Sequence, residues 1–227
     1  MFMGNIYAQE RRYEESIGYA LEAIDIAEKP KENWYQLLTA NYFAIEDFRQ
    51  SARTLRIMID LWPNEIMYWE QLASVNMLQG NLENALASLR VAFEVGLIEK
   101  ESTIKSLVQL SIRQGVPENS ARILEESLKT GLVPEEKEYY DLMAHAWREA
   151  REYDNAIMAH ETSASLSKTG EPFVRIADIH MKFNRWSQAE KALKKALDYE
   201  LSDKGNCLLY TSPSPRDRTR ARMPSSA

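Results

Sequence analysis

The chain has 227 residues, of which 44% are hydrophobic and 27% are charged, and this balance is typical of a folded globular protein and excludes wholesale disorder. The formal charge is −6, and because residues 206–227 hold four Arg and one Asp, the remainder of the chain carries −9. A body this acidic repels a phosphate backbone, which argues against nucleic acid as a partner. The single cysteine, Cys207, excludes an internal disulfide framework, and the 8 Gly and 8 Pro are few enough to favour an all-helical protein.

A short phrase recurs along the chain: an aromatic or apolar residue, two further residues, a small residue, and then an apolar helical face. The small residues of the six copies, in chain order, are Ser16, Ser51, Ala85, Ser120, Ala156 and Ala189. Their spacings are 35, 34, 35, 36 and 33, so the period is close to 34. Each copy predicts a pair of amphipathic helices, and because one hairpin cannot bury both of its faces, successive hairpins are expected to stack.

This period and phrase resemble the tetratricopeptide repeat (TPR) family, whose unit is a helical hairpin of about 34 residues. The third copy matches best, with Trp69 and Leu72 at first-helix positions and Ala85 and Leu89 at second-helix positions. The resemblance implies an all-α fold, a right-handed superhelical solenoid of about six TPR hairpins that covers residues 1–201.

Both ends of the chain are unlike the polar capping units that a solenoid requires. Gly4 and Tyr7 already occupy first-helix positions, so the first unit is expected to be truncated at its N-terminus. Residues 202–227 are predicted to be a disordered Ser/Pro/Arg tail. Its last stretch, TSPSPRDRTRARMPSSA, resembles translated adapter or linker DNA, which would make the tail non-native; the alternative is a natural basic tail that touches an acidic partner. Uncapped ends also predict self-association with a second copy.

The sequence shows no catalytic machinery. Its three histidines, His145, His160 and His180, have neither His-x3-His nor HExxH spacing, and we interpret them as packing or groove residues. There is no phosphate-binding glycine loop, nucleophile elbow or plausible Cys–His pair, so neither an enzyme, a metal site nor a cofactor is predicted. No apolar run approaches the length of a membrane span, so no direct membrane insertion is expected. The tryptophans that recur with the repeat are expected in the core: Trp34, Trp69, Trp147 and Trp186.

Binding is expected in the concave groove, which in a TPR solenoid gathers first-helix positions from successive hairpins. By register, the candidate groove residues are Asn5, Gln36, Phe43, Glu70, Ser74, Met77, Lys105, Gln109, Ile112, His145, Arg148, Asp178 and Lys182. This mixture of polar, apolar and charged side chains predicts a protein or peptide partner. Some TPR domains hold a terminal carboxylate with Lys, Arg and Asn, but Leu37, Ala40 and Glu70 occupy much of the corresponding space here, which argues against that clamp.

The predicted function is a non-catalytic protein–protein interaction scaffold. The phrases YQLLTA, YWEQLA, AWREAREY and WSQA, between Tyr35 and Leu197, also resemble a bacterial group of TPR proteins associated with TonB-type energy-transducing systems. That resemblance implies an accessory component of a TonB-dependent uptake system in the periplasm, with the cytoplasm as the alternative compartment. The alternative function is the helical-repeat arm of a larger enzyme whose catalytic domain lies outside this sequence. RNA-binding repeats of similar period are opposed by the charge of −9 and by the TPR-like aromatic positions.

Overall fold

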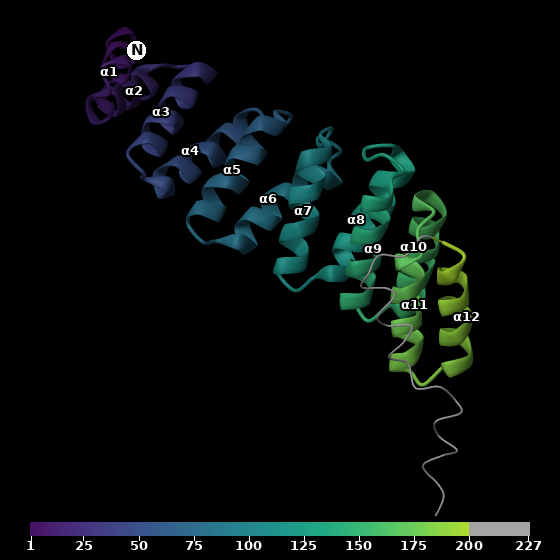
Figure 1. The fold of residues 1–227 in the computed structure, drawn as a ribbon. Helices are drawn as coiled ribbons and strands as arrows, with labels where there is room; N and C mark the ends of the chain where they lie inside the picture. The colour runs from purple at the N-terminus through teal and green to yellow at the C-terminus, as the bar shows by residue number, and fades with distance from the viewer. Residues whose placement is uncertain (200–227) are drawn as a thin grey trace, which may run out of the picture. The chain divides into compact units, whose positions relative to one another are not determined.

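A computed structural model describes residues 1–199, and the regular elements of this range are α-helices (Figure 1). In chain order they are α1 (Phe2–Gln9), α2 (Tyr13–Ile26), α3 (Glu32–Ala44), α4 (Phe48–Leu61), α5 (Ile66–Leu78), α6 (Leu82–Glu94), α7 (Glu101–Arg113), α8 (Pro117–Thr130), α9 (Lys137–Glu149), α10 (Tyr153–Ser167), α11 (Glu171–Lys182) and α12 (Trp186–Leu197). The predicted all-α class is therefore confirmed. The predicted tail, 202–227, lies outside the described residues.

The helices group into two compact units, the first formed by residues 1–116 and the second beginning at residue 117. Within the first unit each helix from α1 to α7 packs mainly on the helices before and after it in the sequence, as Figure 1 shows. The same order holds within the second unit from α8 to α12. Packing between sequence neighbours is the pattern of a stacked helical-hairpin array.

The six small residues of the repeated phrase lie at helix–helix contacts, as predicted. Five of them are completely buried and Ala189 is 3% exposed. Ser16 shows how close the helices come: its hydroxyl donates to the carbonyl oxygen of Gly4 and accepts from the amide of Asn41, both at 2.7 Å. One buried serine therefore ties α2 to both α1 and α3.

The turn inside each hairpin has the same backbone conformation in all six copies. One residue adopts a left-handed conformation with φ between 57° and 74°: Arg11, Glu46, Gly80, Gly115, Arg151 and Asn184. The next amide donates to the carbonyl five residues earlier, at 2.8–3.0 Å, and so satisfies an acceptor at the end of the first helix. Glycine meets this conformation at no steric cost, whereas the four other side chains are strained by it. The turn is therefore conserved in geometry although its sequence is not.

Each unit has its own apolar core. In the first, Leu55 and Met58 of α4 are completely buried against Tyr68 of α5. In the second, apolar side chains of α11 pack on the alanines of α12. The expectation that all four repeated tryptophans are core residues is correct for Trp147, whereas Trp34 and Trp69 are half-buried and Trp186 is 46% exposed. Trp186 is the first residue of α12, whereas the buried residues of that helix are Ala189, Ala192 and Ala196.

Candidate functional site

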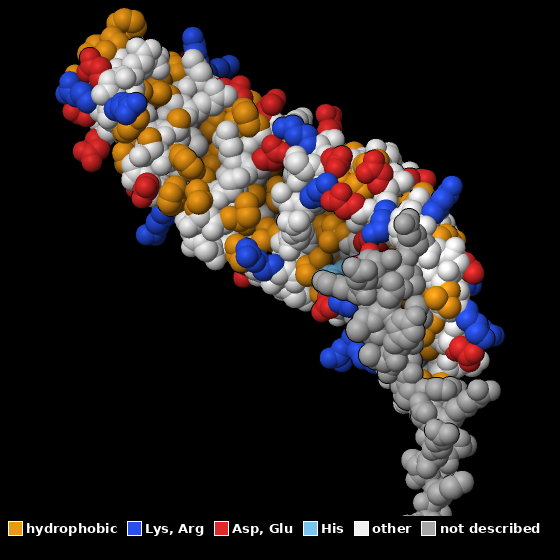
Figure 2. Space-filling view, viewed as in Figure 1, with side chains coloured by type: hydrophobic (Ala, Val, Ile, Leu, Met, Phe, Trp, Pro, Cys, Tyr) orange, Lys and Arg blue, Asp and Glu red, His pale blue; other side chains and the backbone are white. Residues whose placement is uncertain are grey.

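The first unit contains a hollow of about 610 Å³ between α3, α4 and α5, which we call the apolar hollow. It is lined by Gln36, Thr39, Ala40, Phe43, Ser51, Leu55, Met67, Gln71, Ser74 and Val75. Three predicted groove residues, Gln36, Phe43 and Ser74, are thereby brought together. Phe43 and Met67 are 47% and 44% exposed, and hydrophobic side chains lie over the first unit's helices on the face shown in Figure 2.

The side chain of Gln36 is held in place by a buried tyrosine. Its amide Nε2 donates to the hydroxyl oxygen of Tyr68 at 2.9 Å, and that hydroxyl donates to the carboxylate of Glu32. Tyr68 is 1% exposed, and burial, together with the hydrogen bond to Glu32, raises the pKa of Tyr68 to about 12. The phenol therefore stays neutral at any physiological pH. Its hydrogen bonds to Gln36 and Glu32 hold the Gln36 side chain in one orientation.

One polar atom in the apolar hollow lacks a partner. Ser51 is completely buried, and its hydroxyl makes no hydrogen bond to any described residue. An unsatisfied buried hydroxyl costs about 1–3 kcal/mol unless water or a ligand group satisfies it. Ser51 thus adds an unsatisfied hydroxyl to a lining that also contains the polar side chains of Gln36, Thr39, Gln71 and Ser74.

A smaller hollow of about 280 Å³ lies between α5, α6 and α7 and includes three predicted groove residues, Glu70, Ser74 and Met77. The carboxylate of Glu70 already accepts from the hydroxyl of Thr103 at 2.5 Å and lies 3.6 Å from the ammonium of Lys100. Glu70 therefore links α5 to α7, and Ser74 and Met77 are exposed in this hollow together with Lys100, Ser102 and Ser106.

The second unit contains a hollow of about 470 Å³ among α9, α10 and α11, which we call the basic hollow. It is lined by Arg148, Glu149, Arg151, Tyr153, His160, Arg175, Asp178, Ile179 and Lys182. The predicted groove residues Arg148, Asp178 and Lys182 meet here. Its lining has four permanent cations and two carboxylates, in contrast to the acidic chain as a whole.

His160 is the most deeply buried group of the basic hollow, at 3% exposed. Burial, and secondarily the charge of Arg175, lower the pKa of His160 to about 4. The imidazole is therefore neutral at pH 7, and its Nδ1 has no hydrogen-bond partner among residues 1–199. His180, by contrast, lines a different hollow beside Phe173, so the two histidines do not form one site.

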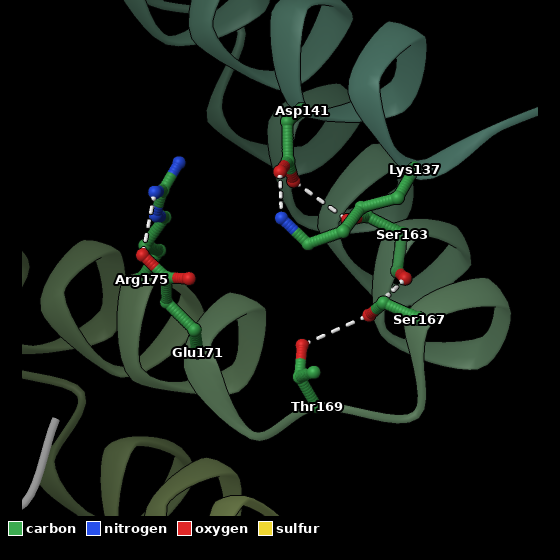
Figure 3. Close-up of polar contacts among 7 residues, drawn as sticks. All are labelled: Lys137, Asp141, Ser163, Ser167, Thr169, Glu171 and Arg175. Carbon is green, nitrogen blue, oxygen red and sulfur yellow. Dashed lines mark hydrogen bonds and ion pairs between the residues drawn. The ribbon is translucent and has the colours of Figure 1, made fainter. Parts of the chain in front are cut away.

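Acidic groups beside the basic hollow have specific partners (Figure 3). Asp141 accepts hydrogen bonds from Lys137 of its own helix and from the hydroxyl of Ser163, the latter at 2.6 Å. On α11, the guanidinium of Arg175 donates to Glu171 one turn before it, at 2.9 Å. The hydrogen bond between Asp141 and Ser163 links α9 to α10. Arg175 uses one guanidinium nitrogen to bind Glu171.

The remaining predicted groove residues lie outside the three hollows. Asn5, Gln109 and His145 are exposed, whereas Lys105 and Ile112 are half-buried. In the absence of a bound partner, their assignment to a binding surface stays a prediction. Within residues 1–199 there is no group of three metal-ligating side chains, and none of the helices is both long and apolar enough to span a bilayer.

Two arginines of the basic hollow, Arg151 and Arg175, are not among the groove residues predicted from helical register. Arg175 lies on the same face of α11 as Asp178, three residues before it, so a wider helical stripe would have included it. Arg151 lies in the hairpin turn in a left-handed conformation, where helical register has no meaning. Only the structure could place it.

Comparisons with known proteins agree on the repeat type. The tetratricopeptide repeat family matches residues 1–33. No curated protein sequence matches the chain. Similar solved structures include the MamA protein, which is 18% identical over 79% of this chain and 94% of that chain, with a TM-score of 0.51. Another is YrrB, described as a TPR protein with an unusual peptide-binding site, at 14% identity, 80% and 91% coverage and a TM-score of 0.50.

A third similar structure belongs to a longer chain and has a higher TM-score. The structure of Naa15/Naa10 bound to HypK-THB is 17% identical over 96% of this chain and 32% of that chain, with a TM-score of 0.65. At these identities the likeness shows the fold alone, and the fold is that of TPR proteins.

Proposed function

We propose that this chain is a protein-interaction scaffold that binds a segment of a partner protein, with an apolar side chain of that segment seated in the apolar hollow. The observation that carries the proposal is the exposure of Phe43 and Met67 at the mouth of a concave site whose floor is the buried core residue Leu55. Aromatic side chains and methionine are enriched at protein interfaces, and a hollow of this size accepts one large side chain with its neighbours.

The apolar hollow also has polar groups that can bind the backbone of a partner segment. The hydroxyl of Ser51 and the amides of Gln36 and Gln71 supply polar contacts around the apolar surface. Such groups fix the orientation of a bound backbone, while the apolar side chain supplies affinity. The peptide-binding site named for YrrB supports the proposal only by likeness of fold.

Site-specific photocrosslinking in the full chain tests the proposal. A benzophenone amino acid at Met67, inside the apolar hollow, is expected to crosslink a partner in cell extract. The matched control places the same group at Ile57 on α4, which is outside the lining and similarly exposed, at 41% against 44% for Met67. Equal crosslinking of one protein from both positions would contradict a site-specific interaction.

A substitution checks the crosslinked partner. Phe43→Asp adds a charge to an apolar contact at a half-exposed position, and because it also removes the edge-to-face contact with Phe48, circular dichroism checks that the helix content is retained. We expect it to weaken binding of the identified partner by about tenfold or more, since an apolar anchor contributes about 2 kcal/mol at an interface. Unchanged affinity would place the binding surface elsewhere on the chain.

The identity of the crosslinked protein also separates the narrower roles. Components of an outer-membrane uptake system or its inner-membrane energy transducer would support an accessory role in TonB-dependent uptake in the periplasm. A purely cytosolic partner would contradict that role. Recovery of a longer reading frame that encodes a catalytic domain would favour the alternative, a repeat arm of a larger enzyme. The TonB-associated role is what the sequence resemblance implies.

Self-association stays a prediction with one structural observation in its favour. Phe2 on α1 and Ile26 on α2 are 78% and 76% exposed. Apolar side chains this exposed favour contact with a second copy. Sedimentation velocity over a range of concentrations tests it, and a monomeric mass throughout would refute it.

A further inference from the structure

We infer that the basic hollow of the second unit binds side-chain carboxylates of an acidic partner segment. This inference deepens the proposed function and rests on it, because it names the chemistry of a segment that the scaffold holds. It concerns a different set of helices from the apolar hollow, so the two can be tested separately.

The geometry shows cations converging from three elements. Arg148 comes from the end of α9, Arg151 from the hairpin turn and Arg175 from α11, and all three line one hollow of about 470 Å³. Lys182 completes the set from the end of α11. Like charges gathered in one concavity repel one another, and a bound anion relieves that repulsion.

The partners of these cations leave them able to bind an anion. Lys182 donates to the hydroxyl of Tyr153 at 2.7 Å, a neutral acceptor. Arg148 lies 3.4 Å from its sequence neighbour Glu149, a long contact between half-exposed groups that is worth little in water. A carboxylate seated between Arg148 and Lys182 would therefore replace weak contacts with charge-assisted hydrogen bonds.

The buried His160 is an independent indication of a ligand. Its neutral imidazole lines the hollow, and Nδ1 has no hydrogen-bond partner in the described part of the chain. Buried polar atoms are almost always satisfied, so an unpartnered one beside a concave site points to a water or a ligand group as its partner. A neutral imidazole can donate one hydrogen bond to a carboxylate oxygen.

The lining suits a glutamate side chain in charge and in apolar surface. Four cations against Glu149 and Asp178, with His160 neutral, give a net charge of +2. A net positive lining attracts an anionic side chain. The side chain of Ile179 and the ring of Tyr153 add apolar surface on which the methylene groups of a glutamate can pack.

The test measures binding of a defined probe to the full chain by fluorescence anisotropy. The probe is a short fluorescein-labelled peptide of alternating Glu and Gly, with an amidated C-terminus so that no terminal carboxylate is present. Because the chain has a formal charge of −6, an acidic peptide that binds does so through a local positive site. We expect saturable binding that the matched Gln peptide lacks.

Two double variants locate the binding. Arg148→Gln with Lys182→Gln removes two charges from the basic hollow, and Lys129→Gln with Lys194→Gln removes two exposed charges of the same unit that do not line it. We expect the first to weaken binding about tenfold and the second less than twofold. Circular dichroism checks that both variants retain their helix content.

Each other outcome overturns the inference. Equal weakening by the two double variants would show a diffuse charge effect. Equal binding of the Gln peptide, or no binding of the Glu peptide, would show that the basic hollow does not recognise carboxylates. Tighter binding of a phosphoserine version than of the Glu peptide would reassign the hollow to phosphate. None of these outcomes affects the proposed function, because Phe43→Asp and the crosslink at Met67 test the apolar hollow independently.

Discussion

The buried His160 predicts a specific dependence of stability on pH. Its pKa is about 4 in the folded chain against an ordinary value of 6.5, so the unfolded chain takes up the proton first as pH falls. The stabilisation is therefore fully present above pH 6.5 and is lost as pH drops toward 4. With 1.36 kcal/mol per pKa unit, the whole loss is about 3 kcal/mol, and about 2 kcal/mol of it falls between pH 7 and pH 5.

The charged neighbours of His160 determine what the measurement must control for. Arg175, Arg148 and Lys137 disfavour the imidazolium, whereas Asp141 favours it, and burial outweighs all of them. Urea unfolding followed by circular dichroism at pH 7 and pH 5 gives the free energy of unfolding of the parent chain and of His160→Gln. Carboxylates that titrate in this range affect both proteins alike, so the difference between the two pH dependences isolates His160.

We expect the parent chain to lose about 2 kcal/mol more than His160→Gln between pH 7 and pH 5. Equal pH dependences would refute the reasoning, because they would mean that His160 is protonated as easily in the folded chain as in the unfolded one. A nuclear magnetic resonance titration of the imidazole in the parent chain gives a second measurement that needs no variant. A midpoint near 6.5 there would refute it as well.

Two further predictions concern the turns and the core. Gly80 has a φ of 74° with open space around its Cα, so Gly80→Ala is expected to lower the free energy of unfolding by about 1 kcal/mol through backbone strain alone. Glu46→Gly, at the equivalent turn, is expected to raise it by about 0.5 kcal/mol. Urea midpoints check both, and a neutral Gly80→Ala would contradict the strain. Leu124→Ala is expected to lower the free energy of unfolding by about 2–5 kcal/mol because Leu124 is completely buried. Leu197→Ala, at a 61% exposed position, should change it by less than about 0.5 kcal/mol. Equal losses of stability in thermal unfolding would contradict this difference.

The repeat was readable from the sequence because one physical requirement recurs. Residues 16, 51, 85, 120, 156 and 189 must be small for the helices to approach, and all six are buried in the structure. The turns were less readable, since Arg11 and Glu46 adopt the left-handed conformation that a sequence pattern expects of glycine. There the helices on either side impose the turn on a residue that does not favour it.

The candidate sites were predictable only in part. Helical register predicted Gln36, Phe43 and Ser74 on one surface, and the structure places all three in one hollow, whose role in binding stays a prediction. It did not show that Glu70 is already paired with Thr103, nor that Arg151 enters a site from a turn. Both facts depend on how neighbouring helices meet, and the sequence period describes one helix at a time.

The packing of each helix mainly on its neighbours in the sequence has a consequence for how binding properties can change. The helices that line the apolar hollow and those that line the basic hollow belong to different hairpins and different cores. Free energies of substitution are close to additive between sites that share no partners. Substitutions in one of the two proposed binding hollows are therefore expected to leave the other unchanged, so selection could alter the two separately.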